Sequence, residues 1–305
     1  MRRTYMSFLA SLLALAVTSS DLRALANRVF VSARSGNDAN ACGNVATPCQ
    51  TFAGTVAQVN AGGEVIVLDS GGYGPVTITK SLTIEAPPGV TAFIHPPSGD
   101  AVTINAGAGD RVILRGLVLS GGSSFGLIVI SVGALHVENC VISGFSQDGI
   151  FVQANAFVFI KDTISRANDD GLFLADGRVS VDHCRFEDNL GVGVFADGAD
   201  VTVRDSVSSG NFVGFKAQTS GTENTILQVY ESLSTNNRGD GFAAAVSGSG
   251  GGFVNARVAN SSVSENVGVG LDNLGGATFE SLGNNFVSGN VGGDVSAGIT
   301  IIGAH

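Results

Sequence analysis

The sequence has no Trp, and His, Tyr and Pro are scarce, with 4, 3 and 6 copies in 305 residues. The lack of Trp leaves few large rings for stacking on sugars, and four His are too few for a His-rich metal site. Only 14% of the residues are charged whereas 44% are hydrophobic, so the composition excludes a disordered chain. Gly, with 43 copies, is the residue present in excess.

The chain also lacks an apolar run long enough to cross a membrane. Residues 8–17 form an apolar run of only ten residues, preceded by Arg2 and Arg3 and followed by the small-x-small site Ala-Leu-Ala at 24–26. This order is typical of a secretory signal, which we predict over residues 1–26, with either general or twin-arginine export. We therefore expect the protein to be secreted, periplasmic or at the cell surface.

Basic residues are too few for a nucleic-acid partner. The formal net charge is −10, and removal of the predicted leader would leave 13 basic and 25 acidic residues, a net charge of −12. Nucleic acids and anionic membranes both require a basic face, so we expect neither nucleic-acid binding nor membrane insertion. An acidic surface suits a neutral glycan, a cation ligand or a solvated secreted protein.

A closing Asn recurs in the second half of the chain at intervals of 21, 22, 26, 29 and 24 residues. The set is Asn168, Asn189, Asn211, Asn237, Asn266 and Asn290. A Gly follows each Asn, and between these marks apolar and polar residues alternate with period 2, the pattern of a strand. Units this short cannot bury their own apolar residues, but a stack of them can. We predict an all-β fold, a right-handed parallel β-helix of roughly ten coils.

Alignment of the coils predicts which side chains point inward. The first residue after each repeated Gly is apolar, whereas the column of second residues includes Lys216 and ends in Asp272, so this second column must face outward. The outward column contains Phe151, Phe173, Phe195, Lys216, Ala243 and Asp272. Three Phe rings are therefore expected to stack along the outer surface of consecutive coils.

The four cysteines form two pairs of different character. Cys42 and Cys49 bound a short loop, NACGNVATPC, and in an exported protein they are predicted to form a disulfide. Cys140 and Cys184 belong to a column of small polar residues that we expect to form a hydrogen-bonded ladder. They lie two coils apart, about 10 Å at the strand spacing of a sheet, whereas a disulfide needs less than about 7 Å. We predict two buried free thiols.

The two ends of the predicted solenoid differ. Residues 27–61 read as a strand, the Cys loop and a short amphipathic helix over 51–59 that plugs the first coil and hides its edge. Residues 62–305 form the coils. The last residues, ITIIGAH, show no comparable cap, so we expect a partner or self-association through the C-terminal coil.

The strand, Cys-bounded loop and capping helix, followed by Asn- and Gly-marked coils, resemble exported bacterial right-handed parallel β-helix repeat proteins of the pectin-lyase-like superfamily. The coil resemblance covers residues 62–302. It implies the fold strongly and a function weakly, because that superfamily includes lyases, hydrolases, epimerases, adhesins and proteins without known activity. The catalytic motifs Gly-His-Gly, Arg-Ile-Lys and Asp-Pro-His-Asp of its enzymes are missing.

Acidic residues nevertheless cluster at one corner. Asp148 and Asp170 precede equivalent glycines on adjacent coils, Asp169 adjoins them, and Lys216 lies two coils further on the same face. A Lys can remove a proton in β-elimination while Ca²⁺ neutralises a uronate, so one hypothesis is a polysaccharide lyase, hydrolase or epimerase using these four residues. The competing interpretation is ordinary turn chemistry, because Asp before Gly is a common turn signal.

We prefer a non-catalytic binding or structural module that contacts a cell-surface polysaccharide or protein, with no cofactor. Insertions at 218–224 and 247–252 lengthen two coils at one corner, and in solenoids such insertions often mark the binding face, although tolerated surface loops look the same. The expected contact residues are Phe151, Phe173, Phe195, Asp197 and Gln218.

A further corner stacks Asp162, His183 and Asp205. This set has the donor types of a metal site, but one imidazole between acids is more typical of a surface ladder of salt bridges. The adjacent column Glu138, Lys161, Asp182 and Arg204 alternates in sign, as stable cross-strand pairing requires. We predict no metal here.

Overall fold

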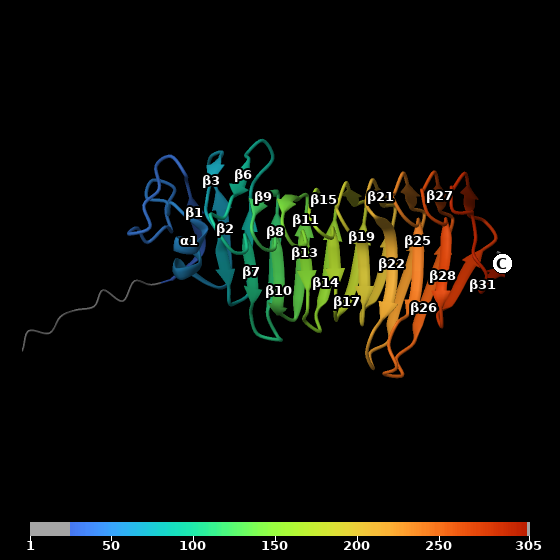
Figure 1. Cartoon of the computed structure of the whole chain (residues 1–305). Helices are drawn as coiled ribbons and strands as arrows, with labels where there is room; N and C mark the ends of the chain where they lie inside the picture. Colours follow the sequence, from blue (N-terminus) through green and yellow to red (C-terminus); the bar gives the residue numbers. More distant parts are fainter. Residues whose placement is uncertain (1–24, 304–305) are drawn as a thin grey trace, which may run out of the picture.

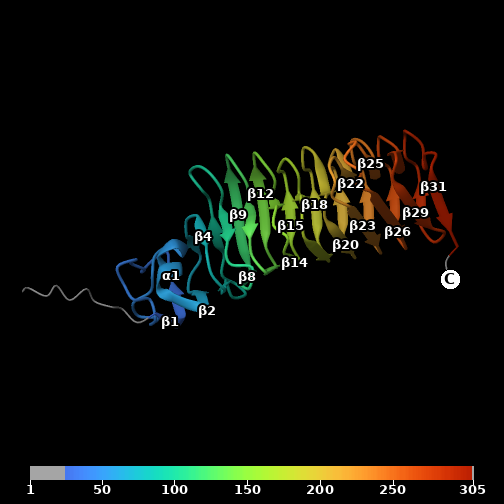
Figure 2. The ribbon, with the colours of Figure 1, turned by 90° about the horizontal axis from the view of Figure 1, so that it is seen from below.

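Every strand of the protein lies parallel to its neighbours, and the strands form three sheets that run the length of one solenoid. The structure is a computed structural model, and it describes residues 25–303. The predicted leader lies outside the described residues except for its last two positions. Figures 1 and 2 show the coils stacked in chain order from the N-terminal end, where the helix α1 lies, to the C-terminal strand β31.

Each complete coil contributes one strand to each of three sheets, and the coils at the two ends contribute fewer. Sheet A has twelve strands, in the order β1 (Ala26–Val31), β2 (Val59–Val67), β5 (Leu82–Glu85), β8 (Arg111–Arg115), β11 (Ala134–Glu138), β14 (Phe157–Lys161), β17 (Arg178–Asp182), β20 (Asp200–Arg204), β23 (Thr225–Tyr230), β26 (Val254–Ala259), β29 (Thr278–Leu282) and β31 (Ile299–Ile302). Sheet B has ten, β3 (Gly71–Gly72), β6 (Ala92–Ile94), β9 (Leu117–Gly122), β12 (Val141–Phe145), β15 (Ile164–Arg166), β18 (Arg185–Glu187), β21 (Val207–Ser209), β24 (Leu233–Thr235), β27 (Ser262–Ser264) and β30 (Phe286–Ser288). Sheet C has nine, β4 (Val76–Ile78), β7 (Val102–Asn105), β10 (Leu127–Ser131), β13 (Ile150–Val152), β16 (Leu172–Leu174), β19 (Val192–Asp197), β22 (Val213–Thr219), β25 (Phe242–Val246) and β28 (Leu271–Gly275). The predicted parallel β-helix is confirmed.

The closing Asn residues form a buried ladder inside the corner between sheets B and C. The backbone N–H of Asn189 donates to the side-chain oxygen of Asn211 at 2.9 Å, and Asn211 repeats the bond to Asn237 at 3.0 Å. The ladder runs through Asn168, Asn189, Asn211, Asn237, Asn266 and Asn290. A buried amide without a partner costs about 1–3 kcal/mol, which explains why Asn returns at this corner.

The Gly that follows each Asn is required by close packing. A Cβ on Gly193 would lie 2.0 Å from the hydroxyl oxygen of Ser208 and 2.7 Å from the carbonyl oxygen of Gly214. No side chain fits in that space, because the Ser208 hydroxyl donates to this same carbonyl at 2.7 Å. The Asn and Gly repeat is therefore architectural.

The small polar column also forms the ladder that the sequence predicts. The backbone N–H of Cys184 donates to the hydroxyl of Ser206 at 3.0 Å, and that of Ser206 donates to Ser232 at 3.2 Å. Cys140 and Cys184 are buried free thiols, as predicted. Burial raises the pKa of Cys140 to about 11 and that of Cys184 to about 12, so both thiols stay protonated and unreactive near neutral pH.

The N-terminal end is capped. Cys42 and Cys49 form the predicted disulfide. The helix α1 (Phe52–Gln58) begins after Thr51, whose side chain accepts the N–H of Gly54, and it buries Phe52 against the ring of Tyr73 at 5.0 Å between centroids. Within residues 25–303, no helix has the length and apolar character needed to cross a membrane.

Candidate functional site

The outer face of sheet C carries the predicted row of Phe rings. Phe151 pairs with Phe173, Phe173 with Phe195 and Phe195 with Lys216 in successive strands, so the predicted register is confirmed. The rings stack with centroid separations of 5.2 and 4.8 Å and interplanar angles of 20° and 15°. Because the rings lie face to face along the solenoid axis, they present their edges to the solvent.

Both ends of this row are closed. Phe125, which the sequence analysis missed, stacks on Phe151 at 5.1 Å, and the Lys216 Nζ lies 4.7 Å from the ring centroid of Phe195. Beside the row, Val192, Val213 and Ala243 form a small buried cluster against Phe195. The outward column is therefore half-buried at Phe195, because Val192 and Val213, which begin β19 and β22, pack beside it.

The acidic residues at the edge of sheet C bind backbone groups. A carboxylate oxygen of Asp148 accepts the N–H of Asp170 at 3.3 Å, and a carboxylate oxygen of Asp170 accepts the N–H of Val192. Asp240 accepts the N–H of Val269 in the same way at 2.8 Å. Each carboxylate therefore ties its corner to the next coil, which is the structural role that turn chemistry predicts.

Burial changes the acidity of this cluster. Desolvation, followed by the negative charge of Asp170, raises the pKa of Asp148 to about 7. Desolvation also raises the pKa of Asp170, while its bond from Val192 and the nearby charge of Lys216 act in the opposite direction. The structure therefore brings Asp148, Asp169, Asp170 and Lys216 to one edge of sheet C. In the described part of the chain, these three aspartates do not converge tightly enough to form a preassembled cation site.

The two insertions lie side by side where sheet C ends. The N–H of Ser247 donates to the carbonyl oxygen of Thr219 at 3.0 Å, and Figure 1 shows the loops, in orange, projecting beyond the other coils. Asp197 pairs with Gln218 in adjacent strands and accepts the N–H of Ser220 at 3.3 Å. A shallow pocket of about 230 Å³ lies between Phe173 and the first loop.

At the corner between sheets A and B, Asp182, His183 and Asp205 gather their donor atoms within 4.8 Å of one another. His183 Nδ1 lies 2.9 Å from a carboxylate oxygen of Asp182, and the Lys161 Nζ lies 3.7 Å from the other carboxylate oxygen. The predicted alternation of charge is present, since Lys161 pairs with Asp182 and Asp182 with Arg204. The set differs from the predicted one, because Asp182 rather than Asp162 groups with His183 and Asp205, and the ion pairs at this corner are those of Asp182 with His183 and Lys161.

The most exposed pair of aromatic rings on the sheets lies elsewhere, on the outer face of sheet A. Phe157 and Phe159 in β14 are 53% and 43% exposed. His136 stacks on one face of Phe159 at 4.8 Å, and the guanidinium carbon of Arg178 lies 5.7 Å from the centroid of Phe157. Sequence analysis did not identify this pair.

Small neighbours keep the other ring faces open. On the side away from His136, the strand partner of Phe159 is Ser180, and on the side away from Arg178 the strand partner of Phe157 is Ala134. These side chains are too short to cover a ring. We call this surface, formed by Phe157 and Phe159, the sheet A platform.

Polar groups border the sheet A platform. A groove of about 370 Å³ follows it and is lined by Phe157, Phe159, Arg178, Val179, Ser180, Asp200 and Thr202. In residues 25–303, neither Arg178 nor Asp200 takes part in an ion pair, although they are strand partners. Hydroxyl, carboxylate and guanidinium groups thus surround two open rings. The alternation in FVFIK, with Lys161 outward, is the signal that predicts this placement.

The fold is a parallel β-solenoid of three sheets, and the candidate sites described above lie on its outer faces and corners. The chain belongs to the right-handed β-helix family, whose model, described as "Right handed beta helix region", matches residues 51–208 and 100–291. No curated protein matches the sequence.

The chain is similar to several solved structures at low identity. A pectate lyase, Pel9A, is 16% identical over 91% of this chain and 78% of its own, with a TM-score of 0.65. A rhamnogalacturonan lyase is 12% identical over 86% and 75%, with a TM-score of 0.42. The A-module of the mannuronan C-5 epimerase AlgE6 of Azotobacter vinelandii is 14% identical over 82% of both chains, with a TM-score of 0.29. At 16% identity, the likeness to Pel9A shows the fold alone.

Proposed function

We propose that the protein is a non-catalytic module that binds a neutral polysaccharide along the outer face of sheet A. The observation that carries the proposal is the sheet A platform, where Phe157 and Phe159 each keep one ring face open to solvent. The apolar face of a pyranose packs on such a ring, and its hydroxyl groups require donors and acceptors around the ring. Ser180, Thr202 and Asp200 supply them in the groove.

Charge supports a neutral ligand. Arg178 and Asp200 face one another across neighbouring strands, so the platform itself has groups of both signs. The whole chain has a net charge of −10, which opposes the approach of a polyanion. The Cys42–Cys49 disulfide supports a site of action outside the cytoplasm, where such bonds persist.

A panel of soluble polysaccharides in affinity electrophoresis tests the proposal. A neutral glycan such as xylan or a β-glucan is expected to retard the wild-type protein. The Phe159→Ala variant is expected to bind the same glycan with about tenfold lower affinity. Phe93→Ala is the matched control, because Phe93 is also exposed but lies on sheet B. Equal retardation of wild type and Phe159→Ala by every glycan would refute the sheet A site.

A second candidate function is β-elimination on a uronate polymer at the edge of sheet C. One observation favours it. Lys216 lies close enough to Asp170 for its positive charge to oppose the rise in the pKa of Asp170, and Asp148 lies in the coil adjacent to that of Asp170. In such a reaction the Lys216 amine would take the proton from the carbon next to the uronate carboxylate. A double bond would form to the neighbouring carbon as the bond from that carbon to the glycosidic oxygen breaks, and the released oxygen would take a proton from water. Asp148, Asp169 and Asp170 would be the carboxylates available to Ca²⁺.

The lyase candidate has its own readout. Polygalacturonate and alginate, each with and without added Ca²⁺, would be assayed for unsaturated products and new reducing ends. Product formation by the wild type that is lost in Lys216→Ala would establish the enzyme. Absence of product from all substrates would leave the sheet C carboxylates with the backbone role described above.

A further inference from the structure

The open face of the Phe159 ring points along the solenoid axis. Phe159 in β14 is the strand partner of His136 in β11, and the two rings stack with their centroids 4.8 Å apart and an angle of 25° between their planes. Neighbouring strands of a sheet are also about 4.8 Å apart, so the rings stack in the direction in which the coils follow one another. The free face of Phe159 is therefore turned toward the next coil, above Ser180.

The direction of this face determines how a sugar lies on it. A pyranose packs with its ring parallel to the aromatic ring, so its plane crosses the solenoid axis. When both glycosidic bonds of a sugar are equatorial, they leave the ring close to its own plane, and the chain continues in that plane. Sheet A blocks this plane on the side of the core, so the course that remains for the chain is parallel to the strands.

The groove beside the sheet A platform has matching dimensions. Its lining residues come from β14, β17 and β20, three successive strands that span about 10 Å along the axis. In the next strand, β23, Gln228 pairs with Thr202, and its side-chain oxygen accepts the hydroxyl of Tyr230 at 2.9 Å. These longer side chains lie outside the groove lining. The groove is thus short along the axis, which fits a chain that crosses the solenoid.

Four polar side chains of this groove have unused hydrogen-bonding groups. Arg178 and Ser180 lie in β17, two residues or about 7 Å apart, and Asp200 and Thr202 are their strand partners in β20. Within residues 25–303, none of these four side chains forms a hydrogen bond or an ion pair. The Arg178 guanidinium instead lies over the ring of Phe157. Donors and acceptors are therefore available to the hydroxyl groups of a stacked sugar and of its neighbour in the chain.

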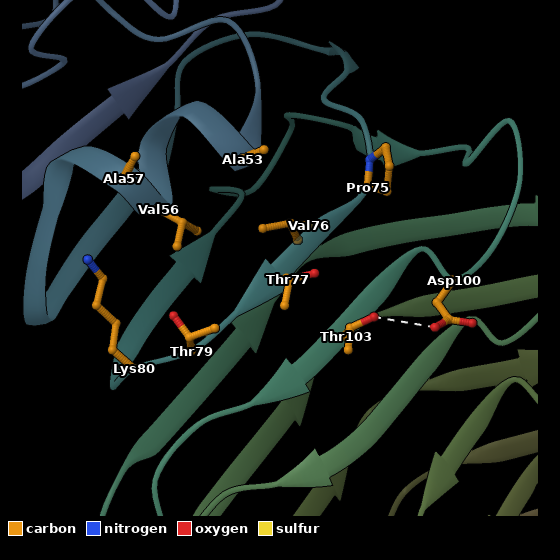
Figure 3. A pocket seen from close by; sticks show the side chains of 10 residues that line it. All are labelled: Ala53, Val56, Ala57, Pro75, Val76, Thr77, Thr79, Lys80, Asp100 and Thr103. Atoms are coloured by element: carbon orange, nitrogen blue, oxygen red, sulfur yellow. Dashed lines mark hydrogen bonds between the residues drawn. The ribbon is translucent and has the colours of Figure 1, made fainter.

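The groove at the N-terminal end lacks this combination. It lies between α1 and β4 and has a volume of about 560 Å³, but none of the described residues that line it is aromatic, as Figure 3 shows. Its polar groups are also engaged: Thr103 donates its hydroxyl to Asp100 at 3.4 Å, and Lys80 donates to the carbonyl oxygen of Val59 at 2.6 Å. The open ring and the unused polar groups, rather than the size of a groove, therefore distinguish the glycan contact on sheet A.

We propose that the sheet A groove binds an extended glycan with equatorial, β-1,4-type linkages, and that the chain crosses the solenoid parallel to the strands. One sugar packs on Phe159 above Ser180, and the adjacent sugar lies beside Arg178 and Asp200, so about two sugar units contact the protein. An α-1,4-linked chain has an axial bond at every unit and curves out of this plane. This binding mode rests on the proposed function and adds to it the linkage class, the direction of the chain and two specificity residues, Arg178 and Asp200.

The test measures the binding of purified oligosaccharides to the protein by isothermal titration calorimetry. Hexaoses of β-1,4-linked glucose, xylose and mannose are compared with maltohexaose, which has the same glucose units as cellohexaose in α-1,4 linkage. At least one β-1,4-linked hexaose is expected to bind, and maltohexaose is expected to bind at least about tenfold more weakly. For the sugar that binds, affinity should rise from the monosaccharide to about the trisaccharide and then stay constant.

Two variants in neighbouring coils distinguish a chain that crosses the solenoid from one that follows its axis. Asp200→Ala removes hydrogen bonds to the second sugar and should weaken binding about five- to tenfold. Gln228→Ala changes the next strand along the axis and should leave the affinity unchanged. Neither side chain is buried, so the urea midpoints of both variants should match that of the wild type.

Three outcomes would overturn this binding mode and leave glycan binding itself in place. They are binding of maltohexaose as tight as that of the best β-1,4-linked hexaose, affinity that increases steadily up to the hexaose together with weaker binding by Gln228→Ala, and retardation of the protein by a polysaccharide without binding of any hexaose. Absence of binding to every oligosaccharide and every polysaccharide would instead refute the proposed function, and this binding mode with it.

Discussion

Sheets A and C each expose Phe side chains on their outer faces, yet the two rows differ in what they leave open. On sheet C, Phe151, Phe173 and Phe195 follow one another in successive coils and cover each other's faces. On sheet A, Phe159 is followed by Ser180, so the stack ends after one contact with His136. The identity of the residue one coil away therefore decides whether a ring stabilises the solenoid or is available to a ligand.

The largest expected effect is on stability, and it separates the two rows. Phe151→Ser combined with Phe173→Ser removes all three ring–ring stacking contacts of a half-buried row, so we expect a loss of about 2–4 kcal/mol in the free energy of unfolding. Phe157→Ser combined with Phe159→Ser should cost less than about 1 kcal/mol, because these rings are exposed. Urea unfolding of both double variants measures the difference, and equal losses would show that the rows have the same role.

The acidic edge of sheet C should make stability depend on pH. Burial raises the pKa of Asp148 to about 7, above its value of 3.8 in an unfolded chain. The protonated carboxyl is thus favoured by folding: its contribution is full below about pH 4 and is lost as the pH rises through about 7. Asp148→Asn should retain the acceptor for the N–H of Asp170 and remove this dependence, stabilising the protein by about 2 kcal/mol at pH 8. Urea midpoints at pH 5 and 8 measure it, with the exposed Asp188→Asn as control.

A single substitution should make sheet A resemble sheet C. Ser180→Phe places a ring against the open face of Phe159, so we expect glycan affinity to fall about tenfold while stability rises slightly. Ser180→Thr is the size control and should leave both quantities nearly unchanged. Unchanged glycan affinity in Ser180→Phe would mean that the ligand does not use that ring face.

The smallest expected effect concerns the end of the sheet C row. Lys216→Ala removes the ammonium group above Phe195, and we expect a loss of about 0.5–1 kcal/mol in stability with no change in glycan affinity. Lys216→Arg should restore most of the stability. A large loss of glycan affinity in Lys216→Ala would instead favour a ligand site on sheet C.

Sequence reasoning predicted the repeat, the register of the outward column, the disulfide and the two buried thiols. Most of these features depend on residues that recur from coil to coil, so the residues of one coil predict the positions of the equivalent residues in the next. It missed the contribution of Phe125, which precedes its strand and reaches over the neighbouring coil. It also missed the sheet A platform, because Phe157 and Phe159 occur in one coil and are not repeated in the next.

The pattern likewise predicted that Phe173 faces outward but not that its faces are covered. Outward direction follows from the alternation of a strand, whereas access to a ring depends on the side chains around it. Val192 and Val213 occupy the positions that Asp148 and Asp170 hold in earlier coils, and there they bury part of the row. This side-chain packing differs from coil to coil, so it cannot be predicted from the interval at which the repeat recurs.

The central claim is that a sugar packs on the open ring faces of sheet A. The direct measurement is an NMR titration of protein labelled at the ring positions of its 18 Phe residues, with an oligosaccharide of the bound glycan. Signals are assigned by single Phe→Leu variants. The account predicts chemical-shift changes for Phe157 and Phe159 and none for Phe173. Changes at Phe173 with none at Phe157 and Phe159 would contradict it.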